Sequence, residues 1–516
     1  MEKLKKVWVA DQGDGTYINP IIHADYSDPD VIRVGDDFFM TASSFNCTPG
    51  LPILHSKDLV NWKLVNYAIK NVDLPGYELP GHGKAIWAPS IRYHDNKFWI
   101  CVGLPDEGIY MTTAEDPFGE WSPLFLVKEG KGLIDPCPFW DDDGQAYLVH
   151  AFAASRAGQH MKSKLILHRM APDGTKVLDE GKIIFDGTKD HPTLEGPKMY
   201  KRNGYYYIMA PAGGVSTGWQ TIFRSKDVWG PYEDKIVLAQ GNTEINGPHQ
   251  GGWVELESGE SWFIHFQDKG AYGRITHLQP VRWEDDWPLM GHNQDENDVG
   301  EPVLRWQKPK VGKEYPIEVI DTSDLFDGDQ LGLQWQWFAN HQDDWYELGE
   351  FGLRLHAVGI PLEEKTMWSV PNILAQKFPA LQFSVTTKMT ANLKKPSEKA
   401  GLVITGDKYC YLAVHQTEDG WTLSRFEGNK DQQEEGDKFI SSVQLPSNEV
   451  YLRVEVVKNA LCTFKYSLDG KEYYTIGEQF QAVKGRWIGA KVGLYCIDEN
   501  SGEGSADFQY FIVEEI

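Results

Sequence analysis

Three acidic residues each stand directly before a proline or a Gly-Pro pair at the start of a short apolar segment. They are Asp28 in D-P-D-V-I-R, Asp135 in D-P-C-P-F-W and Glu195 in E-G-P-K-M-Y. Cleaving a glycosidic bond with inversion needs a carboxylate that activates water and a protonated acid that donates to the leaving oxygen, about 6.5–9.5 Å apart. A Glu near another acid in a water-poor pocket holds its proton more tightly. We therefore predict Asp28 as general base, Glu195 as general acid and Asp135 as the group that orients Glu195 and raises its pKa.

These acids belong to a pattern that recurs five times in the first 300 residues. In each repeat a short leading strand is followed by a Gly, Asp or Asn turn, an aromatic strand, a loop and a second apolar strand. The repeats are spaced 47 to 61 residues apart, with leading strands at 28–33, 88–93, 135–140, 195–200 and 251–256. Three or four strands at this period are typical of propeller blades around an axial channel. Five repeats predict five blades, and a stack of unrelated hairpins is the alternative.

The same position in equivalent blades faces the same place, so the three acids should converge at the axis. In the second repeat Trp87 and Ala88 occupy that position, and in the fifth Pro248 and His249 precede the strand. One pocket would then hold two Asp, a Glu, a Trp and a His. The alternative for each acid is a turn, because Asp and Pro both favour the turns that lead into strands.

The C-terminal part has a different pattern. A polar connector, Q-K-P-K-V-G-K-E-Y-P, begins near residue 307, and longer strands with alternating apolar and polar residues follow it. Period-two patterning without helices predicts a sandwich of two sheets. The sequence thus predicts an all-β chain, with a propeller over residues 1–310 and a β-sandwich over 320–516; the expected sandwich strands include 351–358, 381–389, 450–457 and 507–513.

Composition excludes several classes of partner. The 516 residues carry a formal net charge of −25, which repels phosphate backbones and anionic lipid, so we expect neither nucleic acid nor membrane as a partner. The six cysteines are far apart with no C-x-x-C pair, so zinc and redox motifs are absent. The N-terminus turns polar before an apolar core of signal length could form. We expect a cytoplasmic protein, or a periplasmic or secreted one if a leader has been removed.

The motifs together resemble glycoside hydrolase family 43, in particular its two-domain β-xylosidase and α-L-arabinofuranosidase branch. The match spans nearly the whole chain and includes the segments N-P-I-I-H-A-D-Y-S-D-P-D-V-I-R (19–33), I-W-A-P-S-I-R-Y (86–93), L-I-D-P-C-P-F-W (133–140), L-E-G-P-K-M-Y-K (194–201) and G-R-I-T-H-L-Q-P-V-R-W (273–283). The resemblance implies the same three roles for Asp28, Asp135 and Glu195. It also implies a concanavalin-like fold for the C-terminal sandwich.

Further site residues follow from the resemblance alone. It implies that Phe45 and Trp87 wall the subsite for the terminal sugar and that Arg274 donates to sugar hydroxyls. The alternatives are blade packing for the two rings and a surface ion pair for Arg274. The segment N-G-P-H-Q-G-G-W-V-E (246–255) makes His249 the candidate for a central histidine, which in relatives contacts substrate or a hydrated Ca²⁺. A structural histidine is the alternative, and no cofactor is otherwise required. We expect the loop 495–504 of the sandwich to narrow the mouth of the active site.

These features predict an inverting, exo-acting enzyme that releases terminal β-D-xylose from xylo-oligosaccharides and also terminal α-L-arabinofuranose. Its substrates would be xylo-oligosaccharides or arabinose-decorated oligosaccharides, and a homo-oligomer is left open. One alternative is an endo-arabinanase or a fructan-cleaving five-bladed enzyme, the latter retaining configuration through an Asp nucleophile. The other is a noncatalytic propeller whose acids only bind sugar hydroxyls.

Overall fold

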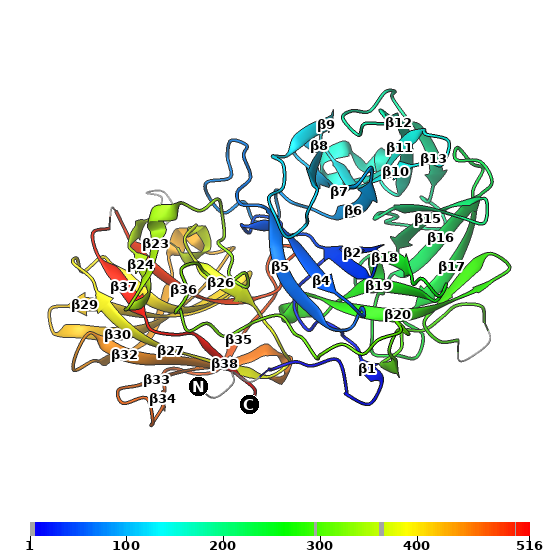
Figure 1. Cartoon of the computed structure of the whole chain (residues 1–516). Helices are drawn as coiled ribbons and strands as arrows, with labels where there is room; N and C mark the ends of the chain where they lie inside the picture. The colour runs from blue at the N-terminus through cyan, green and yellow to red at the C-terminus, as the bar shows by residue number, and fades with distance from the viewer. Residues whose placement is uncertain (1–5, 294–296, 361–365, 501) are drawn as a thin grey trace.

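The computed structural model describes residues 6–293, 297–360, 366–500 and 502–516. Its described part forms two β-rich units side by side, a wheel built from the N-terminal part of the chain and a sandwich built from the C-terminal part (Figure 1). None of the described helices is long and apolar enough to span a membrane. The six cysteines are buried and form no disulfide.

The wheel is a five-bladed propeller, as the repeat predicts. Each blade is a four-stranded antiparallel sheet whose strands follow chain order. The blades are β2 to β5 (Asp30–Val34, Asp37–Thr41, Gly50–Ser56, Trp62–Ile69), β6 to β9 (Pro89–His94, Lys97–Leu104, Gly108–Ala114, Phe125–Glu129), β10 to β13 (Leu133–Trp140, Ala146–Phe152, Lys164–Met170, Lys182–Asp186), β14 to β17 (Lys198–Arg202, Tyr205–Ala212, Trp219–Ser225, Glu233–Ala239) and β18 to β21 (His249–Glu255, Ser261–Asp268, Arg274–Glu284, Trp287–Met290). A short helix, α1 (Ala154–Ala157), follows β11.

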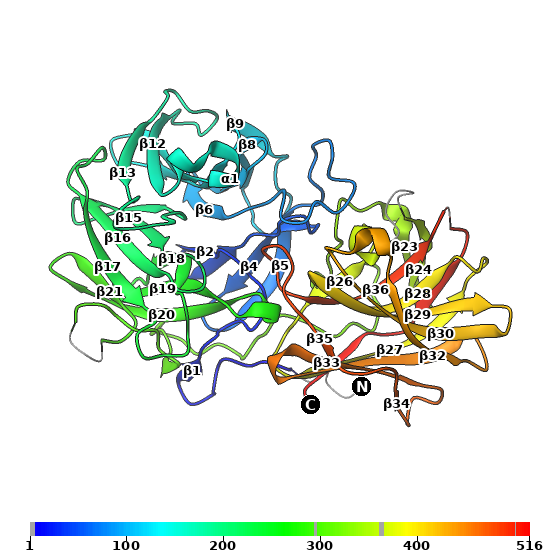
Figure 2. The same ribbon diagram turned by 180° about the vertical axis from the view of Figure 1, so that it is seen from behind.

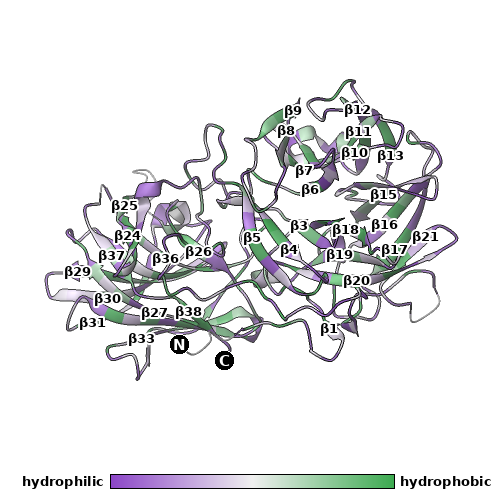
Figure 3. Cartoon of the chain, in the orientation of Figure 1, coloured by the Kyte–Doolittle hydropathy of each residue, from purple (hydrophilic) through white to green (hydrophobic). Residues whose placement is uncertain are grey.

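The aromatic strands predicted from the repeat are the second strand of each blade. In β7, all residues from Phe98 to Leu104 are buried. A strand in the middle of a propeller blade is covered on both faces by the neighbouring blades, so its residues need not alternate between apolar and polar. Figure 3 shows hydrophobic colour on strands of both units, while the loops and parts of some strands are hydrophilic.

The leading strands surround the axis. Strand β2 packs between β6 and β18, and β10 packs between β6 and β14. Buried Asp30 joins the first two blades, because its Oδ2 accepts hydrogen bonds from the Ile91 amide at 2.9 Å and from Arg92 Nη1 at 2.7 Å. On the other side of β2, a Cβ added to Gly252 would lie 2.6 Å from Asp30 Oδ1 and 2.7 Å from the Val31 nitrogen. The wheel therefore closes through a backbone approach that only glycine allows.

The ends of the propeller segment meet in a separate ribbon. Strand β1 (Thr16–Ile18) pairs antiparallel with β22 (Arg305–Gln307). Next to β1, Asn19 Nδ2 donates to the Leu278 carbonyl and to the Val303 carbonyl, each at 2.8 Å. The segment that leads into the first blade is thus fixed against the last one.

The C-terminal unit is a two-sheet sandwich, as predicted. One sheet has the order β23 (Tyr346–Gly349), β24 (Gly352–His356), β37 (Ser505–Phe508), β27 (Phe383–Asn392), β32 (Glu449–Val457), β33 (Leu461–Ser467), β34 (Tyr474–Thr475), with β35 (Phe480–Gln481) and β38 (Ile512–Glu514) attached. The other has the order β25 (Val358–Gly359), β36 (Lys491–Asp498), β28 (Lys399–Thr405), β29 (Lys408–Thr417), β30 (Gly420–Asn429), β31 (Lys438–Gln444), with β26 (Leu374–Lys377) paired to β36. Alternate residues of β32 are buried, as expected for a strand with one face in a core.

The sandwich and the wheel lie against each other (Figure 2), and two regions of backbone contact, the seams, join them. In the first, Thr48 and Trp337 exchange backbone hydrogen bonds of 3.0 and 2.6 Å. In the second, the segment 484–490 before β36 runs along the propeller segment 268–274, and the Ala490 amide donates to the Ala271 carbonyl at 2.7 Å. The second seam lies directly beside the start of β20, where Arg274 is found.

We expect Gly252→Ala to lower the free energy of unfolding by about 1–3 kcal/mol, because the added Cβ would meet backbone and a buried carboxylate that cannot move away. Urea and thermal unfolding measure this. Gly119→Ala is the control, since its nearest contact would be an ordinary 3.5 Å to the Asp116 carbonyl. Equal stability of the two variants would contradict the account of ring closure.

Candidate active site

The hub of the wheel brings the three predicted acids together. Asp28 and Asp135 stand at the same place in blades 1 and 3 and share a left-handed backbone with φ 55°. Such a conformation is uncommon for a residue other than glycine and persists only where the surroundings enforce it. Both residues are buried, whereas the Glu195 side chain keeps 32% of its surface exposed.

Asp28 is surrounded by donors. Ser27 Oγ and Ser43 Oγ donate to its Oδ2 at 2.7 and 2.5 Å. Arg274 Nη1 lies 3.2 Å from Oδ1 and 3.4 Å from Oδ2, and it also donates to Ser27 Oγ at 2.9 Å. Both oxygens of Asp28 are therefore held as acceptors by a short network. Arg274, which the resemblance assigned to sugar hydroxyls, is buried here against the predicted base instead of in a surface ion pair.

Asp135 is the acid that the hub perturbs most. Burial raises its pKa well above the ordinary value near 3.8, and the charges of Glu195 and Asp28 raise it further. The nearby ammonium of Lys198 and a 2.8 Å hydrogen bond from the Gly196 amide to Oδ2 oppose this rise. Because desolvation and like charge are stronger, the carboxyl group of Asp135 keeps its proton to higher pH than an isolated aspartic acid.

Lys198 lies fully buried on β14, one strand position after the E-G-P motif. Its Nζ donates to the Pro89 carbonyl at 2.8 Å and to Ser90 Oγ at 2.9 Å, both in blade 2. A cation carried by blade 4 is thus fixed by hydrogen bonds to blade 2, within electrostatic reach of Asp135 in blade 3. The sequence motif contained this lysine, but nothing in the repeat marked it as part of the site.

His249 contacts Glu195, with Nε2 3.0 Å from Oε1. Its other nitrogen, Nδ1, is buried without a hydrogen-bond partner and faces Gly218. Ca²⁺ takes six to eight oxygen ligands. Over the described ranges, no group of three or more His, Cys, Asp or Glu side chains could hold a metal ion. Calcium at His249 is therefore not confirmed, and the structure places this histidine against the predicted general acid.

Aromatic rings form one wall beside the acids. Phe45 and Ile86 exchange backbone hydrogen bonds of 2.8 and 3.2 Å, which places Trp87 beside the Phe45 ring at a centroid distance of 6.3 Å. Trp87 Nε1 donates to the Gly83 carbonyl at 3.0 Å, and the guanidinium of Arg156 from α1 lies 5.3 Å over its ring. Trp87 is partly exposed, whereas Phe45 is almost completely buried.

A third ring, Trp487, comes from the sandwich. Its centroid lies 6.1 Å from Trp87, and the Arg274 guanidinium lies 5.6 Å from its ring and 4.9 Å from that of Phe266. The backbone of Trp487 has φ 66°. Sequence reasoning missed this residue because the sandwich has no repeat in which an unusual position stands out.

The loop expected to narrow the mouth was assigned wrongly. Residues 495–498 belong to the buried strand β36, and the side chain of Tyr495 donates to the Leu412 carbonyl inside the sandwich. The amides of Glu503 and Gly504 donate to Glu398, also within the sandwich, and residue 501 lies outside the described residues. The segment that approaches the hub is 484–490, just before β36. The error came from placing the loop after this strand instead of before it.

Comparison with known proteins agrees with this geometry. The family model Glycosyl hydrolases family 43 matches residues 17–288, and the model Beta xylosidase C-terminal Concanavalin A-like domain matches residues 323–514. The chain belongs to glycosyl hydrolase family 43. It is therefore a glycoside hydrolase with a β-propeller and a concanavalin A-like sandwich, as the resemblance implied.

Three relatives illustrate the match. A putative β-xylosidase of Xylanibacter ruminicola is 41% identical over 95% of this chain and 87% of its own length. The non-reducing end α-L-arabinofuranosidase BoGH43B of Bacteroides ovatus is 32% identical over 76% of this chain and 74% of its own. The solved structure of xylan β-1,4-xylosidase from Bacillus halodurans C-125 superposes with a TM-score of 0.86 at 27% identity, covering 96% of this chain and all of that one.

The buried Asp135 gives a prediction about stability. Its pKa is raised on folding, so between pH 3.8 and the folded-state pKa the native protein binds more protons than the unfolded chain, and stability falls as pH rises. Asp135→Asn removes this penalty. We expect the melting temperature of Asp135→Asn relative to the wild type to increase from pH 4 to pH 7, together with loss of activity.

Differential scanning calorimetry at several pH values tests this expectation. The control is Asp329→Asn, which changes an exposed carboxylate and should shift stability little at any pH. A stability difference for Asp135→Asn that stays constant or shrinks with pH would show that the raised pKa has been misassigned.

Proposed function

We propose that this protein is an exo-acting, inverting glycosidase that releases terminal β-D-xylose from xylo-oligosaccharides and also terminal α-L-arabinofuranose. The observation that carries the proposal is the hub itself, where two buried carboxyl groups and one partly exposed glutamate lie within electrostatic reach of one another beside an aromatic wall. Two carboxyl groups with different surroundings are what inversion requires. The names of the relatives supply the choice of pentose.

Asp28 is assigned as the general base. In an exo-acting pocket the terminal sugar fills the closed end, and water must attack from the side opposite the leaving group. The Asp28 side chain is only 6% exposed, and the donors around it hold the carboxylate in place, so that a remaining lone pair can take a proton from a trapped water molecule. Arg274 and the two serines keep this carboxylate in one orientation.

Glu195 is assigned as the general acid. The leaving group of an exo-acting enzyme extends towards the mouth, so the proton donor must be the acid that solvent can reach, and Glu195 is the partly exposed one. His249 holds Oε1, which leaves Oε2 for the glycosidic oxygen. Asp135, with its raised pKa, lies close enough to influence the charge on Glu195 and acts as the modulating group.

Closure of the pocket supports exo action. Trp487 of the sandwich lies next to Trp87 and Arg274, so the second domain completes one side of the hub opening. An open groove is needed to bind a polymer in mid-chain, and a walled pocket favours chain ends and short oligosaccharides. The sugars β-D-xylose and α-L-arabinofuranose present similar hydroxyl groups to a small pocket, which supports activity on both.

Initial rates on nitrophenyl β-D-xyloside and nitrophenyl α-L-arabinofuranoside test catalysis and rank the two sugars. We expect turnover of both. Proton NMR of the xylose released from nitrophenyl β-D-xyloside should show the α-anomer first, since inversion changes the anomeric configuration. First appearance of the β-anomer would indicate a retaining mechanism, and lack of turnover on either substrate would favour a sugar-binding propeller.

Substrates with different leaving groups distinguish the role of Glu195 from that of Asp28. Glu195→Gln should slow hydrolysis of xylobiose by about 10²- to 10⁴-fold and that of the nitrophenyl xyloside much less, because nitrophenolate leaves without a proton. Asp28→Asn should slow both substrates alike, because water activation is needed for each. Glu257→Gln, which changes an exposed glutamate on the propeller, is the control and should match the wild type. Equal losses on both substrates for Glu195→Gln would contradict its assignment as the acid.

A further inference from the structure

A buried carboxylate outside the acid triad connects the wheel to the sandwich. Asp25, 5% exposed, lies in the segment that leads into β2. Its Oδ1 accepts the backbone N–H of Arg274 at 2.8 Å, and its Oδ2 accepts the backbone N–H of Gly489 at 2.8 Å. One side chain thus bonds to the first residue of a propeller strand and to the seam segment 484–490 of the sandwich.

The propeller end of this link leads to the predicted base. Arg274 is the residue whose guanidinium contacts Asp28 and Ser27, so fixing its backbone fixes the start of that network. The approach is close, because a Cβ added to Gly273 would lie 2.6 Å from the Asp25 Cβ. Asp25 therefore leaves the arginine backbone little freedom of position.

The sandwich end leads to the aromatic wall. Gly489 is two residues beyond Trp487, and a Cβ on Gly489 would lie 2.7 Å from the Gly273 nitrogen, so the two backbones are in contact. At the other end of the segment, Lys484 Nζ pairs with Asp268 Oδ2 at 2.7 Å. Trp487, with its left-handed backbone, is held between these two anchors.

Both oxygens of Asp25 are needed for this link. Each one accepts a backbone N–H, which the two oxygens of a carboxyl group can do, whereas an amide would turn its NH₂ group towards one of the two N–H groups. Hydrogen bonds to a charged acceptor are stronger than those between neutral groups.

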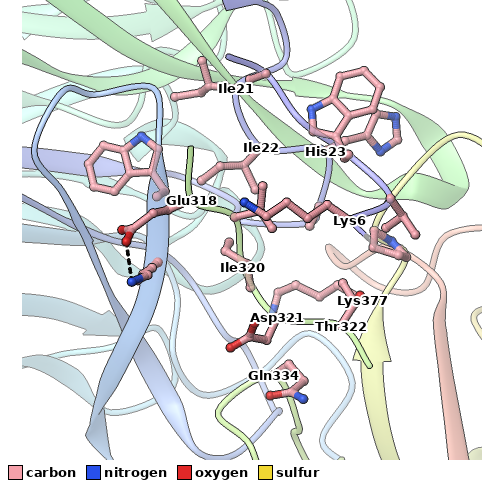
Figure 4. A pocket seen from close by; sticks show the side chains of 18 of the residues that line it. Lys6, Ile21, Ile22, His23, Glu318, Ile320, Asp321, Thr322, Gln334 and Lys377 are labelled. Atoms are coloured by element: carbon pink, nitrogen blue, oxygen red, sulfur yellow. Dashed lines mark ion pairs between the residues drawn. The ribbon is translucent and has the colours of Figure 1, made fainter. Parts of the chain in front are cut away.

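Cations of the sandwich lie near this carboxylate. Burial raises the pKa of Asp25, while the ammonium groups of Lys377 and Lys491 lower it. Both lysines donate to Gln336 Oε1, at 2.7 and 2.9 Å. Lys377 also lines a cavity of about 530 Å³ between the two units, in which Figure 4 shows it together with Asp321 and Gln334. Charge on the sandwich side therefore offsets part of the cost of burying Asp25.

We propose that Asp25 is a positioning residue which links the seating of the Trp487 segment to the orientation of Arg274 and, through it, of Asp28. The inference rests on the proposed function, since it assigns Asp25 a part in the same site. In this arrangement the sandwich takes part in catalysis through one shared carboxylate as well as through the wall it supplies.

A double-mutant cycle of Asp25→Asn and Trp487→Ala tests the link on nitrophenyl xyloside. We expect Asp25→Asn to lower kcat/KM by about 10-fold or more, in line with the loss of a charged hydrogen bond. The decrease should be mainly in kcat, because a displaced Arg274 would no longer hold Asp28 in position. In the Trp487→Ala background, the factor by which Asp25→Asn lowers kcat/KM should be at least about three-fold smaller. The segment that Asp25 orders then no longer carries the Trp487 ring. Asp321→Asn, an acid beside the neighbouring cavity, is the matched control and should leave kinetics unchanged.

Hydrogen–deuterium exchange supplies a readout that does not depend on turnover. Asp25→Asn should increase exchange across residues 484–490 and at the Arg274 amide, with the blade cores unchanged. If Asp25→Asn does not fold, Lys484→Ala breaks the exposed anchor of the same segment and should show the same faster exchange and the same non-additivity with Trp487→Ala.

Independent, multiplicative effects of the two substitutions, or unchanged exchange in 484–490, would overturn the inference. An inactive wild type would overturn the proposed function instead, while the exchange experiment would still decide whether Asp25 orders the segment. The two failures are thus distinguishable.

Discussion

The main constraint on this structure is that three acidic side chains lie close together at the hub of the propeller. Asp28, Asp135 and Glu195 meet at the hub, where burial and the charges of the other two acids raise the pKa of Asp135. Cations lie near these acids: the ammonium group of Lys198 lowers the pKa of Asp135, and Arg274 pairs with Asp28. Removing either cation would leave a buried carboxyl group without a neighbouring positive charge. The resulting loss of stability would be greater than that from breaking an ion pair at the surface. The three acids thus lie in different surroundings, as the proposed division into base, acid and modulating group requires.

The wheel makes that concentration of charge possible. Each acid is carried by a different blade, so their convergence depends on closure of the ring. Closure in turn depends on close backbone contact at Gly252 and on Asp30, which joins the first two blades. The same geometry gives Asp28 and Asp135 identical left-handed backbones. Left-handed backbone and burial therefore coincide at these two acids, and the blade cores supply the stability that maintains them.

The sandwich is part of this arrangement. Its segment 484–490 brings Trp487 to the aromatic wall and meets the propeller through the carboxylate of Asp25. Arg274 contacts both domains. Its backbone N–H donates to Asp25, and its guanidinium lies 4.9 Å from the Phe266 ring of the propeller and 5.6 Å from the Trp487 ring of the sandwich. The second domain of this chain thus contacts the groups around Asp28, the proposed base.

By itself, the sequence determined the five blades, the sandwich and the three acids. Equivalent positions in successive repeats of a propeller lie at equivalent places around its axis, so the repeat predicts which side chains meet there. Asp28, Asp135 and Glu195 could be predicted since they recur at one place in the repeat. Trp87 and His249 occupied the same place in the remaining blades. Lys198, Trp487 and Asp25 could not be found in this way, and the mouth segment was placed after β36 instead of before it. These contacts join blades or domains that are far apart in the chain, and no periodicity records them. Only the packed tertiary structure decides which backbone N–H groups a buried carboxylate meets, because that depends on how two separately folded surfaces fit together.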